Sequence, residues 1–294
     1  MRSIHTFPAR SGFYWAFIFD RWKSKRKFSR HLTPDYVPTV SVVIPALNEA
    51  LNLPHVLPRI PAWVDEILLV DGQSIDDTAT VAQQLLPNIR IVQQAGHGKG
   101  AALRSGFKAA QGDIIVMLDA DGSTDPGEIS AYVGALLAGA DFAKGSRFAQ
   151  GGGTADMPWY RQFGNWCFVT LVRLLFGGSY TDLCYGYNAF WADVLPALNL
   201  EGDGFEIETI MNVRALRANL KVVEVPSFED RRYYGNGRLR TIPDGWRVLK
   251  AIFREWLRPV RRVRFAGEWI DSTYSLRPAE ELARLPRDVK AKTS

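Results

Sequence analysis

The chain has 294 residues, of which 47% are hydrophobic and 23% charged, and its formal net charge is +5. These values are ordinary for a globular protein, and the length allows one large domain with appendages. Cys167 and Cys184 are the only cysteines, which excludes a disulfide framework, argues against a structural zinc site and fits a reducing compartment.

The positive charge is concentrated at the N-terminus. The first 31 residues contain eight Lys or Arg residues and one acidic residue, and the remaining 28 basic and 30 acidic residues nearly cancel. The aromatic run at 13–19 is far shorter than the roughly 20 residues of a spanning helix, and no signal-peptide cleavage site follows it. We therefore predict that residues 1–38 form a basic aromatic arm that contacts a membrane surface. A disordered tail and a helix docked on the protein itself are the alternatives, and nucleic acid is not an expected partner because no reading module is present.

The next segments alternate between strand and helix patterns. In chain order they are a strand at 40–44, a helix at 50–59, a strand at 66–70, a helix at 76–86, a strand at 89–92, a helix at 100–110, a strand at 114–118, a helix at 126–137, a strand at 142–144, a glycine loop at 151–153, an apolar stretch at 164–176, a helix at 205–218, a strand at 222–225 and a helix at 246–256. Strands that alternate with helices of about ten residues indicate βαβ units. We predict an α/β fold with a doubly wound, mostly parallel (mixed) sheet flanked by helices. Its single main domain spans 39–258, and a basic to polar tail at 259–294 is expected to fray.

Two carboxylates follow the strand predicted at 114–118. Asp119 and Asp121 are separated by one residue, and side chains alternate along an extended chain, so both can point the same way at the C-terminal end of the strand. Open α/β sheets bind their ligands at that edge. Two hard oxygen ligands favour Mg²⁺ or Mn²⁺, which completes its shell with substrate phosphates. The alternative is a polar turn, which Asp-Ala-Asp-Gly also suits.

Three further polar segments are expected at the same edge. Residues 45–49 follow the first strand and residues 71–78 follow the second, and both can either hydrogen-bond a nucleobase or ribose or cap the next helix. Residues 96–101 combine glycines, which let the backbone approach a ligand, with Lys99 at a helix start, where it adds a charge for phosphate. This segment lacks the Walker spacing, and no Gly-x-Gly-x-x-Gly follows the first strand.

This ordered set of four segments resembles the family 2 glycosyltransferases, whose GT-A fold binds a sugar nucleotide through one divalent ion. The resemblance covers residues 40–255, most of the chain. It implies that Asp119 and Asp121 hold Mg²⁺ or Mn²⁺ on the donor diphosphate. It also implies a nucleotide-sugar pocket shaped by Pro45, Ala46, Asn48, Glu49, Asp71, Lys99 and Ala120.

The downstream half is most similar to the dolichol-phosphate or polyprenyl-phosphate hexose synthases. The matching motifs are Lys144-Gly-Ser-Arg147-Phe148, Arg161-x-x-Gly-Asn165, Asp182-x-x-x-Gly186, Gly204-Phe-Glu206-Ile-Glu208 and Arg232-Tyr-Tyr-Gly-Asn-Gly-Arg238-Leu239. Two positions depart from these relatives. Gly237 stands where they usually carry Ser, and Ser123 stands where mannosyl relatives often carry Gln, so the resemblance does not assign the sugar.

A polyprenyl phosphate acceptor would add its charge to that of the donor. Together the two ligands bring roughly four to five negative charges into one cleft, which repel one another unless cations intervene. We expect the metal and Lys99 to supply part of this counter-charge. The residues expected on the acceptor phosphate are Arg147, Arg161, Arg232 and Arg238.

A lipid phosphate is already ionised near neutral pH, so it can attack the anomeric carbon in line, with inversion, without a strong base. The expected catalytic residues are Asp119, Asp121, Arg147, Asp182 and Arg232. Asp182, Glu206 and Glu208 are candidates for positioning, or for proton transfer if the acceptor is a sugar hydroxyl. Because Glu206 and Glu208 are two residues apart on a predicted helix, at most one of them should line the cleft.

The sequence therefore predicts a metal-dependent, inverting glycosyltransferase that moves a hexose from a nucleotide diphosphate sugar to a polyprenyl phosphate. We expect it to be peripheral on the cytoplasmic face of a membrane. The nearest alternative is the same enzyme class with a soluble sugar or glycan acceptor. A nucleotide-sugar-binding protein without turnover and a nucleotidyltransferase that releases pyrophosphate are the others.

Overall fold

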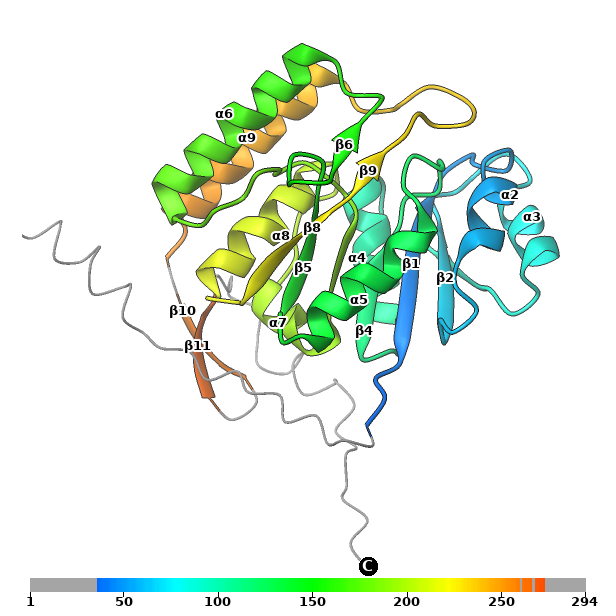
Figure 1. Cartoon of the computed structure of the whole chain (residues 1–294), viewed down its shortest axis with the longest axis horizontal. Helices are drawn as coiled ribbons and strands as arrows, with labels where there is room; N and C mark the ends of the chain where they lie inside the picture. The colour runs from blue at the N-terminus through cyan, green and yellow to red at the C-terminus, as the bar shows by residue number, and fades with distance from the viewer. Residues whose placement is uncertain (1–35, 260, 266–267, 273–294) are drawn as a thin grey trace, which may run out of the picture. The chain divides into compact units, whose positions relative to one another are not determined.

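The computed structural model describes residues 36–259, 261–265 and 268–272. Seven strands form the central sheet in the order β3-β2-β1-β4-β7-β5-β8 (Figure 1). They are β1 (Val40–Ala46), β2 (Glu66–Asp71), β3 (Arg90–Gln93), β4 (Ile114–Met117), β5 (Phe142–Ser146), β7 (Asn188–Trp191) and β8 (Val222–Pro226). β7 is antiparallel to its neighbours β4 and β5, and the other adjacent pairs are parallel. The predicted mostly parallel, mixed sheet is therefore confirmed.

The central strands β1 and β4 are apolar because they are buried on both faces. Val42, Val43 and Ile44 of β1 are fully buried, as are Ile114 and Val116 of β4. Unbroken apolar runs of this kind are typical of parallel strands covered by helices. The strand order changes direction between β1 and β4, because β2 and β3 follow on one side of β1 and β4 lies on the other. Doubly wound sheets bind ligands at such a switch point.

Helices flank the sheet on the connections between its strands. They are α2 (Leu53–Val56), α3 (Thr78–Leu85), α4 (Lys99–Ala109), α5 (Ile129–Leu137), α7 (Leu195–Leu198) and α8 (Glu206–Arg217), with 3₁₀ turns η1 (Leu57–Arg59), η2 (Pro126–Glu128) and η3 (Ala192–Val194). α4 packs on β1, β2 and β3, and α5 packs on β5, β7 and β8. A short parallel pair, β6 (Gly153–Thr154) and β9 (Phe228–Glu229), lies outside the main sheet.

Two long helices, α6 (Trp159–Phe176) and α9 (Thr241–Leu257), lie side by side (Figure 1). Both also contact α8, and the three helices share a second, smaller core. Its buried members are Val169, Val172, Tyr180, Leu183, Val213, Val248 and Ile252. In the part of the chain that the structure describes, no helix has the length and apolar character needed to cross a membrane.

Several predicted boundaries differ from the structure. The helix expected at 50–59 is only α2 and η1, because Pro58 lacks an N–H and restricts the residue before it. α6 begins at Trp159, ahead of the predicted apolar stretch at 164–176 and directly after Pro158, which occupies the N-cap. α9 likewise begins at Thr241, ahead of the predicted start at 246.

Several short elements were not predicted, among them β6, β7, β9, α7 and two strands after residue 259. β7 has four residues and runs antiparallel, so neither its length nor the βαβ spacing indicates it. The expectation that the tail frays after 259 is wrong for β10 (Arg261–Phe265) and β11 (Glu268–Ser272), which form an antiparallel pair. The predicted arm, apart from its last three residues, and residues 273–294 lie outside the described part of the chain.

Candidate active site

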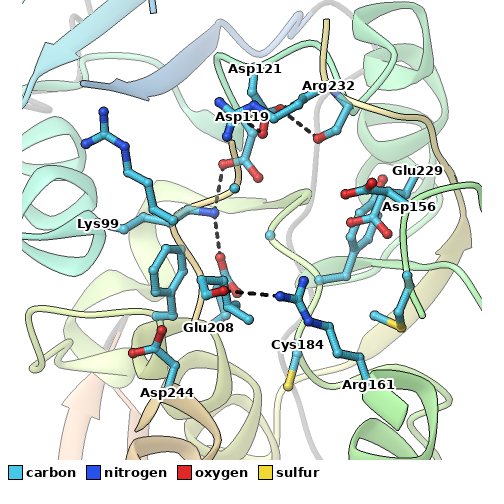
Figure 2. A pocket seen from close by; sticks show the side chains of 18 of the residues that line it. Lys99, Asp119, Asp121, Asp156, Arg161, Cys184, Glu208, Glu229, Arg232 and Asp244 are labelled. Carbon is cyan, nitrogen blue, oxygen red and sulfur yellow. Dashed lines mark hydrogen bonds and ion pairs between the residues drawn. The ribbon is translucent and has the colours of Figure 1, made fainter. Parts of the chain in front are cut away.

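A cleft of about 460 Å³ opens at the carboxyl ends of β1 and β4, within the size range of small-molecule sites. Its lining comes from segments that are far apart in the sequence (Figure 2). They include the end of β1 and the residues after it, the start of α4, the turn after β4, Arg147 directly after β5, parts of α6, α8 and α9, and the segment between β9 and α9.

Lys99, the first residue of α4, lies between two carboxylates (Figure 2). Its Nζ atom is 2.7 Å from Oδ1 of Asp119 and 2.8 Å from Oε1 of Glu208. Burial lowers the pKa of Lys99, but the two carboxylates outweigh this effect and raise it above its ordinary value. Burial also raises the pKa of Glu208, against the attraction of Lys99. Gly186 closes over this group, and a Cβ at that position would lie 2.8 Å from both Nζ of Lys99 and Oε1 of Glu208.

Asp121 lies beside a second ion pair. Its Oδ1 atom accepts hydrogen bonds from the backbone N–H and the hydroxyl of Ser123, at 3.0 and 2.7 Å. The guanidinium of Arg232 is 3.9 Å from Oδ2 of Asp121 and donates to both carboxylate oxygens of Glu49, at 3.0 and 3.2 Å. Burial raises the pKa of Glu49, which the hydrogen bond from Asn52 and the charge of Arg232 oppose.

Arg147 directly follows β5 and lines the cleft, and two carboxylates neutralise its charge. It donates to Asp182 through Nε (2.7 Å) and Nη2 (3.0 Å), and to both oxygens of Glu229 at 3.0 Å. The side chain of Asp182 is fully buried and does not line the cleft. Asp182 is therefore placed to position Arg147 and not to touch a substrate, which differs from the catalytic role expected for it.

Arg161 and Arg238 line the same cleft but make hydrogen bonds to neutral groups. Arg161 donates to Oγ1 of Thr241 at 3.1 Å and to the carbonyl of Leu239 at 3.2 Å, and Arg238 donates to the carbonyl of Leu47. Within the part of the chain that the structure describes, neither guanidinium is paired with a carboxylate. These two residues therefore carry positive charge that an anionic ligand can neutralise.

Three of the four predicted polar segments line the cleft. Pro45, Ala46 and Glu49 do so from the first, Lys99 from the third, and Asp119, Ala120 and Asp121 from the fourth.

The structure does not bring Asn48 and Asp71 into this lining. Asp71 is buried and accepts from the N–H of Ser74 and from Gln93. Asn48, in the left-handed region at φ 54°, accepts from the N–H of Ile75. The side chain of Asn48 thus ties residues 71–78 to the first segment, whereas that of Asp71 fixes its own turn and links it to β3.

Residues 230–240 form one wall of the cleft, and hydrogen bonds join them to the turn after β4 and to the residue before α2. The backbone N–H of Asp230 donates to the carbonyl of Ser123, and that of Tyr233 to the carbonyl of Asp121. Asn52 exchanges two hydrogen bonds with the backbone of Tyr234, and the ring of His55 stacks on Tyr233 with centroids 4.3 Å apart. This wall is thus bonded directly to the turn that carries the acidic pair.

The chemistry of the ligand atoms at the strand end fits a divalent cation that is shared with a substrate. In the described part of the chain, no group of three or more His, Cys, Asp or Glu side chains is arranged to hold a metal. Asp119 and Asp121 could supply two carboxylates, and Mg²⁺ normally completes its shell with waters and phosphate oxygens. The residues present therefore fit a metal that binds together with a diphosphate.

Sequence reasoning missed Glu229, although it lies three residues before Arg232 in an acidic and basic run. Glu208 lines the cleft while Glu206 instead accepts from the backbone of Gly204, in agreement with the prediction that at most one of them does. Cys184 also lines the cleft, and burial raises the pKa of its thiol to about 12, which keeps it neutral.

Comparisons with known proteins show which sequences and folds this chain resembles. A polyprenol monophosphomannose synthase of Mycolicibacterium smegmatis is 32% identical over 230 residues, which cover 73% of this chain and 85% of that protein. An undecaprenyl-phosphate mannosyltransferase of Micrococcus luteus is 32% identical over 212 residues, covering 68% and 87%.

Among solved structures, glucosyl-3-phosphoglycerate synthase from Mycobacterium tuberculosis, crystallised with Mn²⁺, UDP and phosphoglyceric acid, superposes with a TM-score of 0.61 at 22% identity, covering 84% of this chain and 92% of that one. At this identity the likeness shows the fold. Residues 41–197 of the present chain match Glycosyl transferase family 2. The chain therefore belongs to glycosyltransferase family 2 and is a glycosyltransferase with a GT-A fold.

Proposed function

We propose that this glycosyltransferase transfers a hexose from a nucleotide diphosphate sugar to a polyprenyl phosphate, with inversion and with Mg²⁺ or Mn²⁺, at the cytoplasmic face of a membrane. The names of the two curated relatives, a polyprenol monophosphomannose synthase and an undecaprenyl-phosphate mannosyltransferase, support this acceptor class.

The observation that carries the proposal is the two-sided character of the cleft. One end holds the acidic pair and Lys99, as a metal-bound diphosphate requires. The other end, beside α6 and α9, is lined largely by apolar side chains, with Arg161 next to them. The apolar lining residues there are Met157, Tyr160, Phe168, Cys184, Leu239 and Val248. An apolar wall next to the guanidinium of Arg161 suits a phosphate attached to an isoprenoid better than a sugar hydroxyl.

The residues of the chain then have distinct tasks. Asp119 and Asp121 would hold the metal, which supplies charge stabilisation to the leaving diphosphate. Arg161 and Arg238 bind and orient the acceptor phosphate. Asp182 and Glu229 fix the Arg147 guanidinium at the wall between the two ends. No general base is assigned, because the acceptor phosphate is already ionised near neutral pH.

Product partitioning tests the acceptor class. Purified protein is incubated with Mn²⁺, a radiolabelled nucleotide sugar and polyprenyl phosphate in detergent, and the product is extracted into organic solvent. We expect label in the organic phase only when polyprenyl phosphate is present, together with release of a nucleoside diphosphate. Label that stays in the aqueous phase on a sugar or a small phosphorylated acceptor would contradict the lipid assignment, and pyrophosphate release would indicate nucleotidyl transfer.

Replacement of Arg161 should act on the acceptor alone. We expect Arg161→Ala to raise the KM for polyprenyl phosphate about tenfold to a hundredfold, because a charge-assisted contact to phosphate is lost, and to leave the KM for the nucleotide sugar near its wild-type value. Steady-state kinetics with each substrate varied separately measure both constants. Lys108→Ala, which removes an exposed cation of α4 outside the cleft, is the control and should change neither. A rise confined to the donor KM would contradict the assignment.

A further inference from the structure

The outer side of α6 carries a stripe of large apolar side chains. Trp159, Phe163, Trp166 and Leu174 are 77%, 60%, 61% and 77% exposed. Their spacing of about one or two helical turns places them on one side of the helix. The opposite side of α6 is already used, because Asn165, Val169 and Val172 are buried there. The exposed residues therefore do not contribute to the hydrophobic core.

The outer side of α9 repeats this arrangement. Ile242 is 84% exposed, Trp246 57%, Phe253 42%, Trp256 51% and Leu257 73%, and helical spacing again places them along one side. The inner side is filled by Val248, Ala251 and Ile252. A surface helix of a globular protein normally turns its polar face outward. α6 and α9 each present apolar residues on both sides, and they lie next to each other in Figure 1.

The exposed charged side chains of these two helices all carry positive charge. Both helices are fully described, and their exposed charged residues are all basic. They are Arg173, Arg247, Lys250 and Arg254. The only two acidic residues, Asp244 and Glu255, are buried. Asp244 accepts from Arg247 and from the N–H of Arg240, and Glu255 pairs with the buried Arg214 of α8.

We propose that the outer faces of α6 and α9 dock on the surface of an anionic lipid bilayer. Trp, Phe and Leu side chains insert at the boundary between headgroups and acyl chains, and neighbouring Lys and Arg residues bind anionic headgroups. Lys250 already lies over the ring of Trp246, 5.5 Å from its centroid, so aromatic and cationic groups are presented together. A second copy of the chain is a poorer occupant of this face, because self-association would bring its exposed basic residues together.

Docking of this face would bring the cleft close to the bilayer, an inference that rests on the proposed function. The same two helices line the apolar end of the cleft, through Tyr160, Arg161 and Phe168 of α6 and Gly245 and Val248 of α9. A helix pair held at the bilayer surface would therefore present this end of the cleft to lipids. A polyprenyl phosphate could then place its headgroup at Arg161 without its chain crossing water.

Vesicle binding by the full-length protein tests the surface. Cosedimentation is measured with vesicles of phosphatidylcholine alone and with vesicles that also contain phosphatidylglycerol. We expect binding to the anionic vesicles and at least an approximately tenfold loss of affinity in each of two double variants, Trp246→Ser with Phe253→Ser and Lys250→Gln with Arg254→Gln. None of these four residues lines the cleft. Matched controls are Trp63→Ser and Lys108→Gln, which change an exposed tryptophan and an exposed lysine elsewhere on the domain and should bind as the wild type does.

Three outcomes would overturn the proposal. The double variants could bind as the wild type does while substitution of Lys23, Lys25, Arg26 and Lys27 abolishes binding, which would assign the membrane contact to the N-terminal arm. Light scattering could show a dimer that the apolar double variant dissociates without loss of vesicle binding, which would make the face a protein interface. Failure of the wild type to bind either kind of vesicle would also refute it.

A soluble acceptor separates this proposal from the proposed function. With a short-chain isoprenyl phosphate that dissolves in water, the double variants should transfer sugar at the wild-type rate, and they should be slower only when a long-chain acceptor is embedded in vesicles. If the wild type binds anionic vesicles but transfers sugar to neither acceptor, the docking surface stands and the lipid acceptor fails. If it transfers to both and the variants are unaffected on vesicles, the docking surface fails alone.

Discussion

Asp121→Asn is expected to reduce the rate of sugar transfer about a thousandfold or more while the protein stays folded. Asparagine keeps the shape of aspartate and an oxygen that can accept the two hydrogen bonds from Ser123, so the turn after β4 should survive. The substitution removes a negative charge that a divalent cation needs, and electrostatic stabilisation of a leaving diphosphate is worth several kcal/mol. Initial rates at saturating donor, measured with a Mn²⁺ titration, give the size of the effect.

Ligand binding provides a second readout for Asp121→Asn that does not depend on turnover. In the wild type, a nucleotide sugar with Mn²⁺ should raise the melting temperature more than either ligand alone, because only the folded state binds them. The variant should lose this joint effect. Asp77→Asn, which alters an exposed aspartate before α3 that makes no side-chain cap, is the matched control. Near-normal transfer by Asp121→Asn, or an undiminished Mn²⁺-dependent shift, would refute the metal site.

Asp182→Ala is expected to lower the free energy of unfolding by about 3–5 kcal/mol, the typical loss when one partner of a buried ion pair is removed. Asp182 and Arg147 have almost no exposed side-chain surface, and among the described residues Glu229 is the anionic partner that the guanidinium would keep. Chemical denaturation at neutral pH measures the difference. Replacing both partners, as in Arg147→Met with Asp182→Leu, should recover part of this loss, because the buried guanidinium that Asp182 neutralises is then removed as well.

Lowering the pH should reduce the difference in the free energy of unfolding between the wild type and Asp182→Ala. Burial raises the pKa of Asp182, but Arg147 and Lys144 outweigh burial, and the net pKa is lowered. A carboxylate with a lowered pKa contributes stability above its unfolded-state pKa and loses it as pH falls through the folded-state value. The wild type and Asp182→Ala should therefore converge in acid. A difference of less than about 1 kcal/mol at neutral pH would show that the ion pair contributes little.

The parts of the fold that the sequence predicts well are those set by local composition. The apolar runs of β1 and β4 and the helices between the parallel strands follow from patterns within a few residues. β7 could not be predicted because a four-residue antiparallel strand depends on neighbours that are distant in sequence. The early start of α6 had a local signal in Pro158, since proline favours helix starts, but the aromatic residues after it do not resemble a first helical turn.

The candidate site likewise has a part that the sequence predicts and a part that it does not. That Asp119 and Asp121 follow a central strand and share its end could be deduced from spacing alone. The partners of the cations could not, because Arg147 meets Asp182 and Glu229 across 35 and 82 residues of chain. An arginine in a motif therefore predicts a charge in the site, but only the fold shows whether that charge is already compensated.

The hydrogen bonds and ring contacts that hold residues 230–240 in place affect how fast this wall of the cleft can open. This wall is bonded through its backbone to the acidic turn and through Tyr233 and Tyr234 to α2 and the residue before it. A wall held in this way can move aside only when those bonds open together, and such openings take microseconds to milliseconds. Any step that needs this wall to move aside would then be slow, and loss of the hydrogen bonds at Asn52 should make the wall open more readily.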